Sequence, residues 1–318
     1  MKVAVAGAGV GGSLCARILA EKGFDVDLID IIRTNACSIA PCAWMTTREI
    51  VPLLRTAGLN ADDFILKTFA SAVFCGYEVG ADLITVDKPA LINALRGDLP
   101  VSTHTPDTSE YDRIIDATGT ARAYLPPPKN DDLVSCVQFK GTLREGRDLP
   151  EVRFIHGGYA WSFPLGGGEF HVGCLSHLED PRLLIRTCPL FTGLDSICGC
   201  TSTLRVTSPW EGGPFVSGNV WGVGESIGCV YPLVGDGIIP AIRSVHLLIR
   251  HWEDAGAYED AIRAEFPQMK VERDILVSLK QGQRPRLSQL RKIDPKRLGV
   301  SIGAAEAAAL FLKVISSR

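Results

Sequence analysis

Residues 2–12 have the sequence KVAVAGAGVGG, in which a short apolar strand runs directly into a glycine-rich turn. An apolar helical pattern begins immediately after the turn. A strand, a glycine turn and a helix in this order are typical of a dinucleotide-binding βαβ unit. Gly7 permits the tight turn, Gly9 leaves room for a pyrophosphate, and Gly12 lets the helix pack closely on the strand. The free N–H groups at the start of the helix are expected to hold the phosphates.

The residues after the glycine motif support the same interpretation. Residues 24–30 form the next predicted strand, which ends on an acidic residue about twenty positions after the glycines. A carboxylate at this place can accept hydrogen bonds from an adenosine ribose. The alternative is a glycine-rich turn in another kind of α/β protein. The residues that this motif predicts to contact a cofactor are Gly7, Gly9, Gly11, Gly12 and Asp30.

Composition and charge exclude several classes of protein. The chain has 318 residues, 46% of them hydrophobic, which is enough for one large core or two smaller ones. Its formal charge of −3 gives no reason to expect a nucleic-acid partner. Glycines and charged residues interrupt the apolar start, which argues against a secretory signal. No apolar run approaches the roughly 20 residues that cross a bilayer, so we expect a soluble, cytoplasmic protein.

The chain contains ten cysteines. Cys15, Cys174 and Cys229 lie in apolar or glycine-rich stretches, where cysteine commonly acts as a small buried hydrophobe. Cys198-Gly199-Cys200 is closer to a metal motif, but it lacks the paired CxxC spacing of zinc and iron–sulfur sites. We therefore predict reduced thiols and no metal site.

The remaining segments predict an α/β domain that is interrupted by an antiparallel insert. Residues 133–216 contain short strands separated by glycine, proline and polar turns, as in an antiparallel sheet. We expect residues 1–132 and 217–318 to form the dinucleotide-binding domain, and 133–216 to form a substrate domain with 66–86 as candidate further strands. The predicted strands are 66–79, 83–86, 111–119, 134–143, 153–156, 161–164, 169–174, 202–206 and 220–224. The predicted helices are 49–59, 89–95, 238–252, 258–266, 269–279 and 304–315, and the predicted loop is 31–47.

Two further glycine-containing stretches indicate which dinucleotide to expect. The strand that ends at residues 117–119 (ATG) is followed much later by 224–228 (GESIG) and 232–238 (PLVGDGI). A nicotinamide dehydrogenase needs only the first glycine motif, whereas an FAD fold of this kind uses all three stretches. The Glu225 carboxylate can accept a hydrogen bond from a ribityl hydroxyl, and the N–H groups that open the next helix can face the flavin or a phosphate. We therefore predict FAD as the cofactor.

The three stretches together resemble the para-hydroxybenzoate-hydroxylase-like superfamily of FAD-dependent oxidoreductases. Within it, residues 159–164 (YAWSFP) match the YxWxFP signature of the geranylgeranyl reductase family, and 232–238 are similar to its P-x-x-G-[ED]-G-I run. Residues 41–43 (PCA) stand where the family has a Pro-Cys-Gly turn beside the flavin. The chain also has Glu225 in place of the usual aspartate, and Lys88 in place of an arginine, which loses the bidentate fork.

The resemblance implies an enzyme that saturates carbon–carbon double bonds in isoprenoid chains, such as the geranylgeranyl groups of archaeal membrane lipids. An isolated double bond needs a reduced flavin, a proton donor and a dry apolar tunnel. The implied catalytic residues are Cys42, which can equally be a structural thiol, and Tyr159. The implied substrate contacts, which can also simply pack the sheet against the flavin domain, are Tyr159, Trp161, Phe163 and Pro164. The implied cofactor contacts are Gly7, Gly9, Gly11, Gly12, Asp30, Cys42, Ala43, Lys88, Ala117, Gly119, Glu225, Gly235, Gly237 and Ile238.

Four further charged or titratable residues are weaker candidates. His156 and His171 can titrate near neutrality, although a hydrogen-bonded surface or core histidine is the commoner outcome. Arg48 and Arg122 can steady phosphate or flavin oxygens, or can be solvated charges.

The expected partners are a hydrophobic prenyl or lipid substrate and an external electron donor, either NAD(P)H or a ferredoxin-type protein. Two alternatives fit the same fold. One is an FAD-dependent monooxygenase, and the other is a flavin- or lipid-binding protein without catalysis. The helix predicted at 304–315 has an apolar side, so it can rest on a membrane surface or pack as an ordinary terminal helix.

Overall fold

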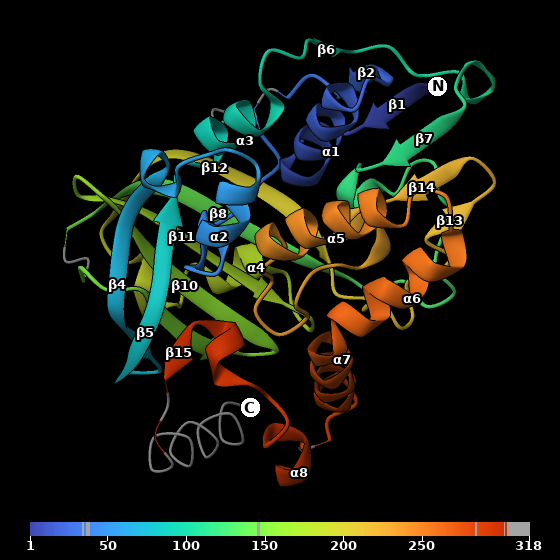
Figure 1. The fold of residues 1–318 in the computed structure, drawn as a ribbon. Helices are drawn as coiled ribbons and strands as arrows, with labels where there is room; N and C mark the ends of the chain where they lie inside the picture. The colour runs from blue at the N-terminus through green and yellow to red at the C-terminus, as the bar shows by residue number, and fades with distance from the viewer. Residues whose placement is uncertain (34, 36–38, 145–146, 284, 302, 304–318) are drawn as a thin grey trace.

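The part of the chain that the structure describes folds around two β-sheets, one of six strands and one of nine (Figure 1). The first sheet is mainly parallel and the second mainly antiparallel, which confirms the predicted fold class. The computed structural model describes residues 1–33, 35, 39–144, 147–283, 285–301 and 303.

The first sheet carries the glycine motif. Its strands are, in spatial order, β13 (Val216–Ser217), β14 (Val220–Gly222), β7 (Arg113–Asp116), β1 (Lys2–Ala6), β2 (Asp25–Ile29) and β6 (Val101–Ser102). All neighbouring strands are parallel except β13 and β14. Val3, Ala4 and Val5 of β1 are fully buried. Because successive side chains point to opposite faces, both faces of this strand are covered, as its continuous apolar run predicts.

Three helices pack together beside the first sheet: α1 (Val10–Glu21), α3 (Lys88–Arg96) and α5 (Ile238–Arg250) (Figure 1). Leu14 and Leu19 of α1 lie in the same buried cluster as the apolar residues of β1. The other α-helices are α2 (Ile50–Thr56), α4 (Pro181–Leu184), α6 (Ala255–Glu265), α7 (Pro267–Lys280) and α8 (Leu287–Leu290). Helices α2, α3, α5, α6 and α7 confirm five of the predicted helices.

The second sheet combines segments from distant parts of the chain. Its strands are, in spatial order, β12 (Leu194–Arg205), β8 (Leu133–Leu143), β11 (Glu169–Ser176), β10 (Gly158–Gly166), β9 (Glu151–Ile155), β4 (Ile65–Phe74), β5 (Tyr77–Val86) and β15 (Val300–Ser301), with β3 (Met45–Thr47) also paired to β5. Neighbouring strands are antiparallel except β4 and β9. The domain boundaries themselves remain a prediction.

The two faces of the second sheet have different neighbours. On β11, Phe170 and Val172 belong to a cluster that α4 and the turn at residues 189–191 cover. The intervening residues, His171 and Gly173, point to the opposite face because side chains alternate along a strand. This opposite face contributes to the candidate site.

The predicted break between residues 79 and 83 is wrong, because β5 runs without interruption. The hairpin turn falls instead at Cys75 and Gly76, between the paired residues Phe74 and Tyr77. Both turn residues have positive φ, 51° and 88°, as a two-residue turn of type I′ requires. A cysteine in the first position of such a turn is an unusual signal, which explains the error.

Two other boundaries also differ from the prediction. β12 begins at Leu194 and not at residue 202. It is an edge strand with many exposed polar side chains, so its sequence lacks the apolar alternation that marks a strand. β3 lies inside the predicted loop 31–47. The helix predicted at 304–315 lies outside the described residues.

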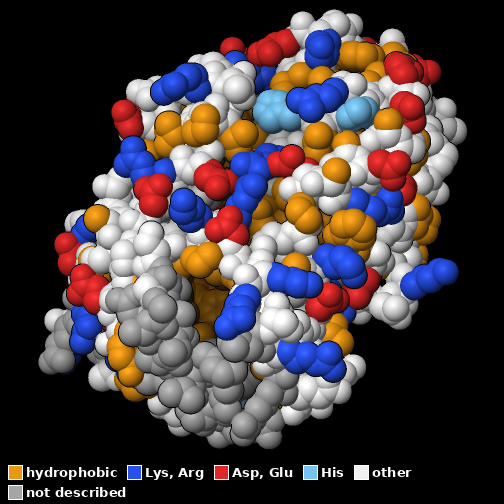
Figure 2. Space-filling model, turned by 60° about the horizontal axis from the view of Figure 1, so that its bottom comes forward, with side chains coloured by type: hydrophobic (Ala, Val, Ile, Leu, Met, Phe, Trp, Pro, Cys, Tyr) orange, Lys and Arg blue, Asp and Glu red, His pale blue; other side chains and the backbone are white. Residues whose placement is uncertain are grey.

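The face that carries α7 and β15 is hollowed, and apolar side chains line the hollow with Lys and Arg side chains beside it (Figure 2). Among the described residues, no helix combines the length and the apolar character that a membrane span needs.

Candidate functional site

The glycine turn joins β1 to α1 with almost no free space at two positions. Gly7 has a φ of 104°, and a Cβ there would overlap the carbonyl oxygen of Ala117. A Cβ on Gly12 would overlap the carbonyl oxygen of Gly7. An ideal Cβ on Gly11 would lie 3.5 Å from Ala241 in α5, which is ordinary contact. Gly7 and Gly12 are therefore required by backbone packing alone.

Gly9 differs from these glycines because its surroundings are open. Apart from Gly9 itself and its two chain neighbours, no described atom lies within 4 Å of an ideal Cβ on Gly9. Gly9 is the N-cap of α1, and no side chain caps this helix among the described residues. The first N–H groups of a helix have no partner within it, and together with the helix dipole they favour an anion. The open space and the helix start fit a pyrophosphate group.

Asp30 lies just beyond β2, next to the glycine turn, whose Gly7 N–H donates to the Ile29 carbonyl at 2.7 Å. The Asp30 carboxylate accepts hydrogen bonds from the Ile31 N–H (2.8 Å) and from the Arg33 guanidinium (3.3 Å). The carboxylate is therefore held at the edge of the sheet where a ribose is expected.

The turn at residues 117–119 is shaped by Asp116, which sequence reasoning missed. This side chain is fully buried at the end of β7. Its carboxylate accepts hydrogen bonds from the backbone N–H groups of Thr118 (3.1 Å), Tyr124 (2.9 Å) and Leu125 (3.0 Å). Asp116 therefore fixes the turn on which Ala117 and Gly119 lie.

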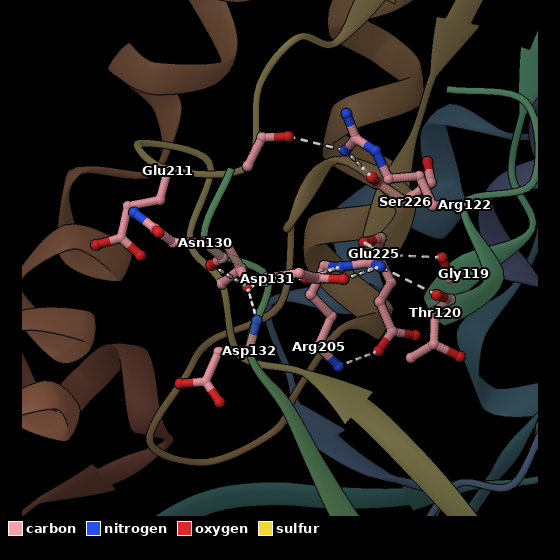
Figure 3. Close-up of polar contacts among 12 residues, drawn as sticks. Gly119, Thr120, Arg122, Asn130, Asp131, Asp132, Arg205, Glu211, Glu225 and Ser226 are labelled. Carbon is pink, nitrogen blue, oxygen red and sulfur yellow. Dashed lines mark hydrogen bonds and ion pairs between the residues drawn. The ribbon is translucent and has the colours of Figure 1, made fainter. Parts of the chain in front are cut away.

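The Glu225 carboxylate lies beside this turn (Figure 3). One carboxylate oxygen accepts the Arg205 backbone N–H at 2.8 Å, and the other lies 3.4 Å from an ideal Cβ on Gly119. Burial raises the pKa of Glu225, and the hydrogen bond and charge of Arg205 oppose that rise. Two of the three predicted stretches therefore meet at Glu225 and Gly119.

The Arg205 guanidinium holds this junction together from β12 (Figure 3). It forms a bidentate pair with Asp131, with both N–O distances 2.8 Å. It also donates to the carbonyl oxygens of Thr120 (3.0 Å), Gly119 (3.3 Å) and Glu225 (3.4 Å). Only 3% of the Arg205 side chain is exposed. Its role depends on contacts distant in sequence, and no local signal predicts it.

Both roles considered for Arg122 are wrong. Its side chain is buried, and its guanidinium donates to the backbone carbonyl oxygens of Pro126, Gly212, Pro214 and Ser226. Figure 3 shows Arg122 beside Ser226. Burial lowers the pKa of Arg122 to about 10, so the side chain remains charged at neutral pH. It fastens loops together and is not solvated.

The Asp236 carboxylate binds the first N–H group of α5. Its carboxylate accepts the Ile238 N–H and the Thr46 hydroxyl, each at 2.9 Å. Burial raises the pKa of Asp236, and these hydrogen bonds oppose the rise. Gly237 belongs to the late glycine stretch and is the N-cap of α5. The late stretch therefore leads directly into the start of this helix.

The charge of Lys88, the first residue of α3, lowers the pKa of side chains from three distant parts of the chain. Burial raises the pKa of Glu225 and Asp236 and lowers that of His171, and the Lys88 ammonium lowers all three. The Lys88 charge therefore acts on side chains from β11 and from both late glycine stretches.

The turn at residues 41–43 is held against β8. The Gln138 side-chain amide donates to the Cys42 carbonyl at 3.0 Å, and the Trp44 N–H donates to the Cys42 Sγ at 3.4 Å. Ala43 does not have a positive φ, whereas Trp44 does, at 61°. The left-handed conformation thus falls one residue later than a Cys-Gly turn predicts. Such strain in a bulky residue is often found at functional sites.

The aromatic residues of β10 share one face of the second sheet. Ring centroids are 5.9 Å apart for Tyr159 and Trp161, and 6.2 Å apart for Trp161 and Phe163. Ala43 packs against the same cluster, so the turn at residues 41–43 and the aromatic face meet. Pro164 points to the other face, because side chains alternate along a strand.

Tyr159 connects this face to the late glycine stretch. Its hydroxyl donates to the Val234 carbonyl at 2.8 Å and lies 3.3 Å from an ideal Cβ on Gly235. Burial raises the pKa of the Tyr159 phenol. The phenol is therefore protonated but already engaged, which makes it a poor proton donor to a substrate.

His171 lies in a small cavity near Cys42. Only 2% of its side chain is exposed, and neither ring nitrogen has a hydrogen-bond partner among the described residues. The Trp44 ring meets the imidazole edge-on, with centroids 4.8 Å apart. Cys198 and Cys200 line the same cavity, although no group of three or more described His, Cys, Asp or Glu side chains is arranged to hold a metal ion.

Two other residues lie in surface pairs. His156 faces Glu179 at 3.9 Å, and Arg48 faces Asp82 at 3.7 Å with 52% of the Arg48 side chain exposed. These positions support a surface histidine at position 156 and a solvated charge at position 48.

No family model matches the chain. An uncharacterized protein of Methanocaldococcus jannaschii, MJ1182, is 28% identical over 334 residues, which cover 86% of this chain and 90% of that protein. A geranylgeranyl bacteriochlorophyll reductase-like protein from Thermoplasma acidophilum has a similar structure, with a TM-score of 0.72 and 18% identity over 99% of this chain and 95% of that one. An HpxO variant from Klebsiella pneumoniae complexed with FAD gives a TM-score of 0.63 and 16% identity over 98% and 99%.

The chain has the fold of the FAD-dependent oxidoreductases. This likeness confirms the fold that the sequence resemblance implied. It also agrees with the position of the open glycine turn at the end of β1, where proteins of doubly wound topology hold a dinucleotide.

A buried carboxyl group lies behind the late glycine stretch. Glu272 of α7 is fully buried, and its carboxylate accepts the Leu233 N–H at 3.0 Å. Burial raises its pKa to about 7. Glu272 therefore supports the loop that Tyr159 also contacts.

Replacing Glu272 with glutamine is expected to change how stability depends on pH. The carboxyl is protonated in the folded protein up to a pKa of about 7, but ionises near 4.5 when unfolded. The unfolded state therefore binds fewer protons between these values, and the wild type loses stability as pH rises through them. As the pH rises through this interval, we expect the free energy of unfolding of the wild type to fall by up to about 3 kcal/mol more than that of Glu272→Gln. Urea denaturation across this pH range tests it, and parallel profiles for the two proteins would contradict it.

Proposed function

We propose that this chain is an FAD-dependent oxidoreductase that reduces carbon–carbon double bonds in prenyl chains. The observation that carries the proposal is the convergence of four segments on one region. The glycine turn meets Ala117 at Gly7 and Ala241 of α5 at Gly11. Gly9 leaves open space at the start of α1, Glu225 meets Gly119, and Asp236 opens α5. The charge of Lys88 acts on both carboxylates.

In this proposal each segment binds one part of the cofactor. The N–H groups after Gly9 bind the pyrophosphate, and Asp30 binds the adenosine ribose. Glu225 binds the ribityl chain, and the start of α5 faces the flavin or a phosphate. The other contacts, predicted from the family, are Gly7, Gly11, Gly12, Cys42, Ala43, Lys88, Ala117, Gly119, Gly235, Gly237 and Ile238.

The flavin would supply a hydride, while the protein provides a dry surface and a proton. Trp161 and Phe163 offer an apolar wall for a hydrocarbon chain, and Ala43 joins that wall to the turn that carries Cys42. Cys42 is the proposed catalytic thiol. The engaged hydroxyl of Tyr159 suits a wall residue better than a proton donor.

The name of the Thermoplasma acidophilum neighbour supports a prenyl group as the substrate. We further propose an external electron donor of the NAD(P)H or ferredoxin type, and peripheral contact with the membrane in which a lipid substrate lies.

An anaerobic reaction tests this function. The protein is loaded with FAD, reduced with dithionite and mixed with a geranylgeranyl lipid in the absence of oxygen. We expect the flavin absorbance near about 450 nm to return, and the lipid to gain two hydrogens for each double bond reduced. Gly9→Val is the matched control, because it fills the space proposed for the pyrophosphate.

The alternatives give different results in the same experiment. A monooxygenase reoxidises only when oxygen is added, and a binding protein without catalysis leaves both flavin and lipid unchanged. Either result would contradict the proposed reduction.

A further inference from the structure

The imidazole of His171 is a buried polar group that the proposed contacts do not use. It lies on β11, opposite Lys140 of β8, and only 2% of it is exposed. Neither ring nitrogen finds a hydrogen-bond partner among the described residues. Burying such a group without a partner costs about 1–3 kcal/mol, and most buried polar atoms in proteins have one. His171 therefore points to a ligand or a water.

The cavity beside His171 has a volume of about 20 Å³. A cavity needs about 10–15 Å³ to hold one water molecule, and the water needs two to four polar partners. His171, Gln138 and Cys42 line this cavity and offer such partners. The cavity is too small for a prenyl group and has the size and polarity for a single water.

Cys42 lines this cavity and is fixed by two contacts. Gln138 donates to the Cys42 carbonyl at 3.0 Å, and the Trp44 N–H donates to Sγ at 3.4 Å. The positive φ of Trp44 (61°) sets the course of this turn and brings the Trp44 ring against His171. The strained turn thus places Cys42 and His171 around the same cavity.

We infer that His171 and one water in this cavity form a proton path that resupplies the Cys42 thiol. The inference rests on the proposed reduction. There, a bound reduced flavin would supply the hydride for one alkene carbon, and the Cys42 thiol gives its proton to the other. The π bond breaks and two C–H bonds form. The thiolate then takes a proton from the water while the water takes one from the imidazole N–H. At the same time the other ring nitrogen accepts a proton that comes from solvent, so the ring stays neutral.

A neutral imidazole is suited to this role, because it carries one N–H donor and one acceptor nitrogen. Burial, together with the charges of Lys140 and Lys88, lowers the pKa of His171 to about 3. The ring is therefore neutral at physiological pH. His171 does not contact the substrate in this proposal. It acts on Cys42 through the water, so it is a positioning residue.

Two substitutions and one control test the path. His171→Phe keeps a ring against Trp44 but removes both nitrogens, whereas His171→Gln keeps a donor and an acceptor. His177→Phe is the control, because burial lowers the pKa of His177 to about 4 and its Nδ1 also lacks a partner among the described residues. His177 lines a different groove.

We expect all four proteins to bind FAD equally. Anaerobic flavin reoxidation by the lipid slows about 100-fold in His171→Phe, by less than about tenfold in His171→Gln, and not at all in His177→Phe. If His171→Phe reacts as fast as the wild type, the path is wrong and the reduction stands. If the wild type binds FAD but does not react with the lipid, the proposed function fails.

A second measurement does not depend on activity. In the FAD-free wild type, nitrogen-detected NMR is expected to show a neutral His171 ring between about pH 5 and 8, with an N–H proton that exchanges slowly. A ring that titrates in this range, or exchanges as fast as a surface histidine, would overturn the inference.

Discussion

Gly12→Ala is expected to destabilise the protein by more than about 3 kcal/mol. In most helices this change stabilises, by about 0.5–1 kcal/mol. Here the new methyl group would overlap the Gly7 carbonyl oxygen and lie 3.1 Å from the Ala117 side chain. Because the first obstacle is backbone, β1 and α1 would have to move apart. Urea denaturation of the purified variant measures the loss.

Gly9 provides the contrast for this prediction. It lies in the same turn, but apart from Gly9 itself and its two chain neighbours no described atom is within 4 Å of an ideal Cβ there, and its φ of −76° suits any residue. We expect Gly9→Val to keep the stability of the FAD-free protein and to lose FAD binding. Equal stability for Gly12→Ala and Gly9→Val would show that the packing argument is wrong.

Arg205→Gln is expected to cost about 3 kcal/mol of stability. Breaking a buried ion pair by removing one partner costs about 3–5 kcal/mol. We take the lower end because 27% of the Asp131 side chain is exposed and water can reach it. The carbonyl oxygens of Gly119 and Thr120 also lose a charged donor. The midpoint of chemical denaturation, with its slope, measures the change.

Arg182 gives the matched control. It forms a similar bidentate pair with Asp180, but 69% of its side chain is exposed. Exposed pairs contribute little to stability, so we expect no measurable change for Arg182→Gln. An equal effect of the two substitutions would contradict a structural role for Arg205.

The first sheet was predictable from sequence because its signals are local. Gly7, Gly9 and Gly12 lie between an apolar strand and an apolar helix, and only a few folds combine these features. The apolar runs of β1 and β7 likewise identify buried strands. These elements place the glycine turn without any knowledge of distant contacts.

The elements that sequence reasoning missed depend on contacts between distant residues. Asp116 and Arg205 are ordinary charged residues until the fold buries them against backbone groups. Many side chains of the edge strand β12 are polar because they are exposed to solvent. His171 was predicted to titrate near neutrality or to be a hydrogen-bonded histidine, and neither prediction is right. Its missing partners become evident only when β8, β11 and the turn at 41–43 meet.

We propose that separated segments of this chain together bind one FAD. The most direct test is to dialyse the purified protein against excess FAD, remove the free cofactor and measure the bound flavin by absorbance. We expect one bound flavin for each chain in the wild type and none in Gly9→Val. A wild-type protein that stays colourless under these conditions would contradict it.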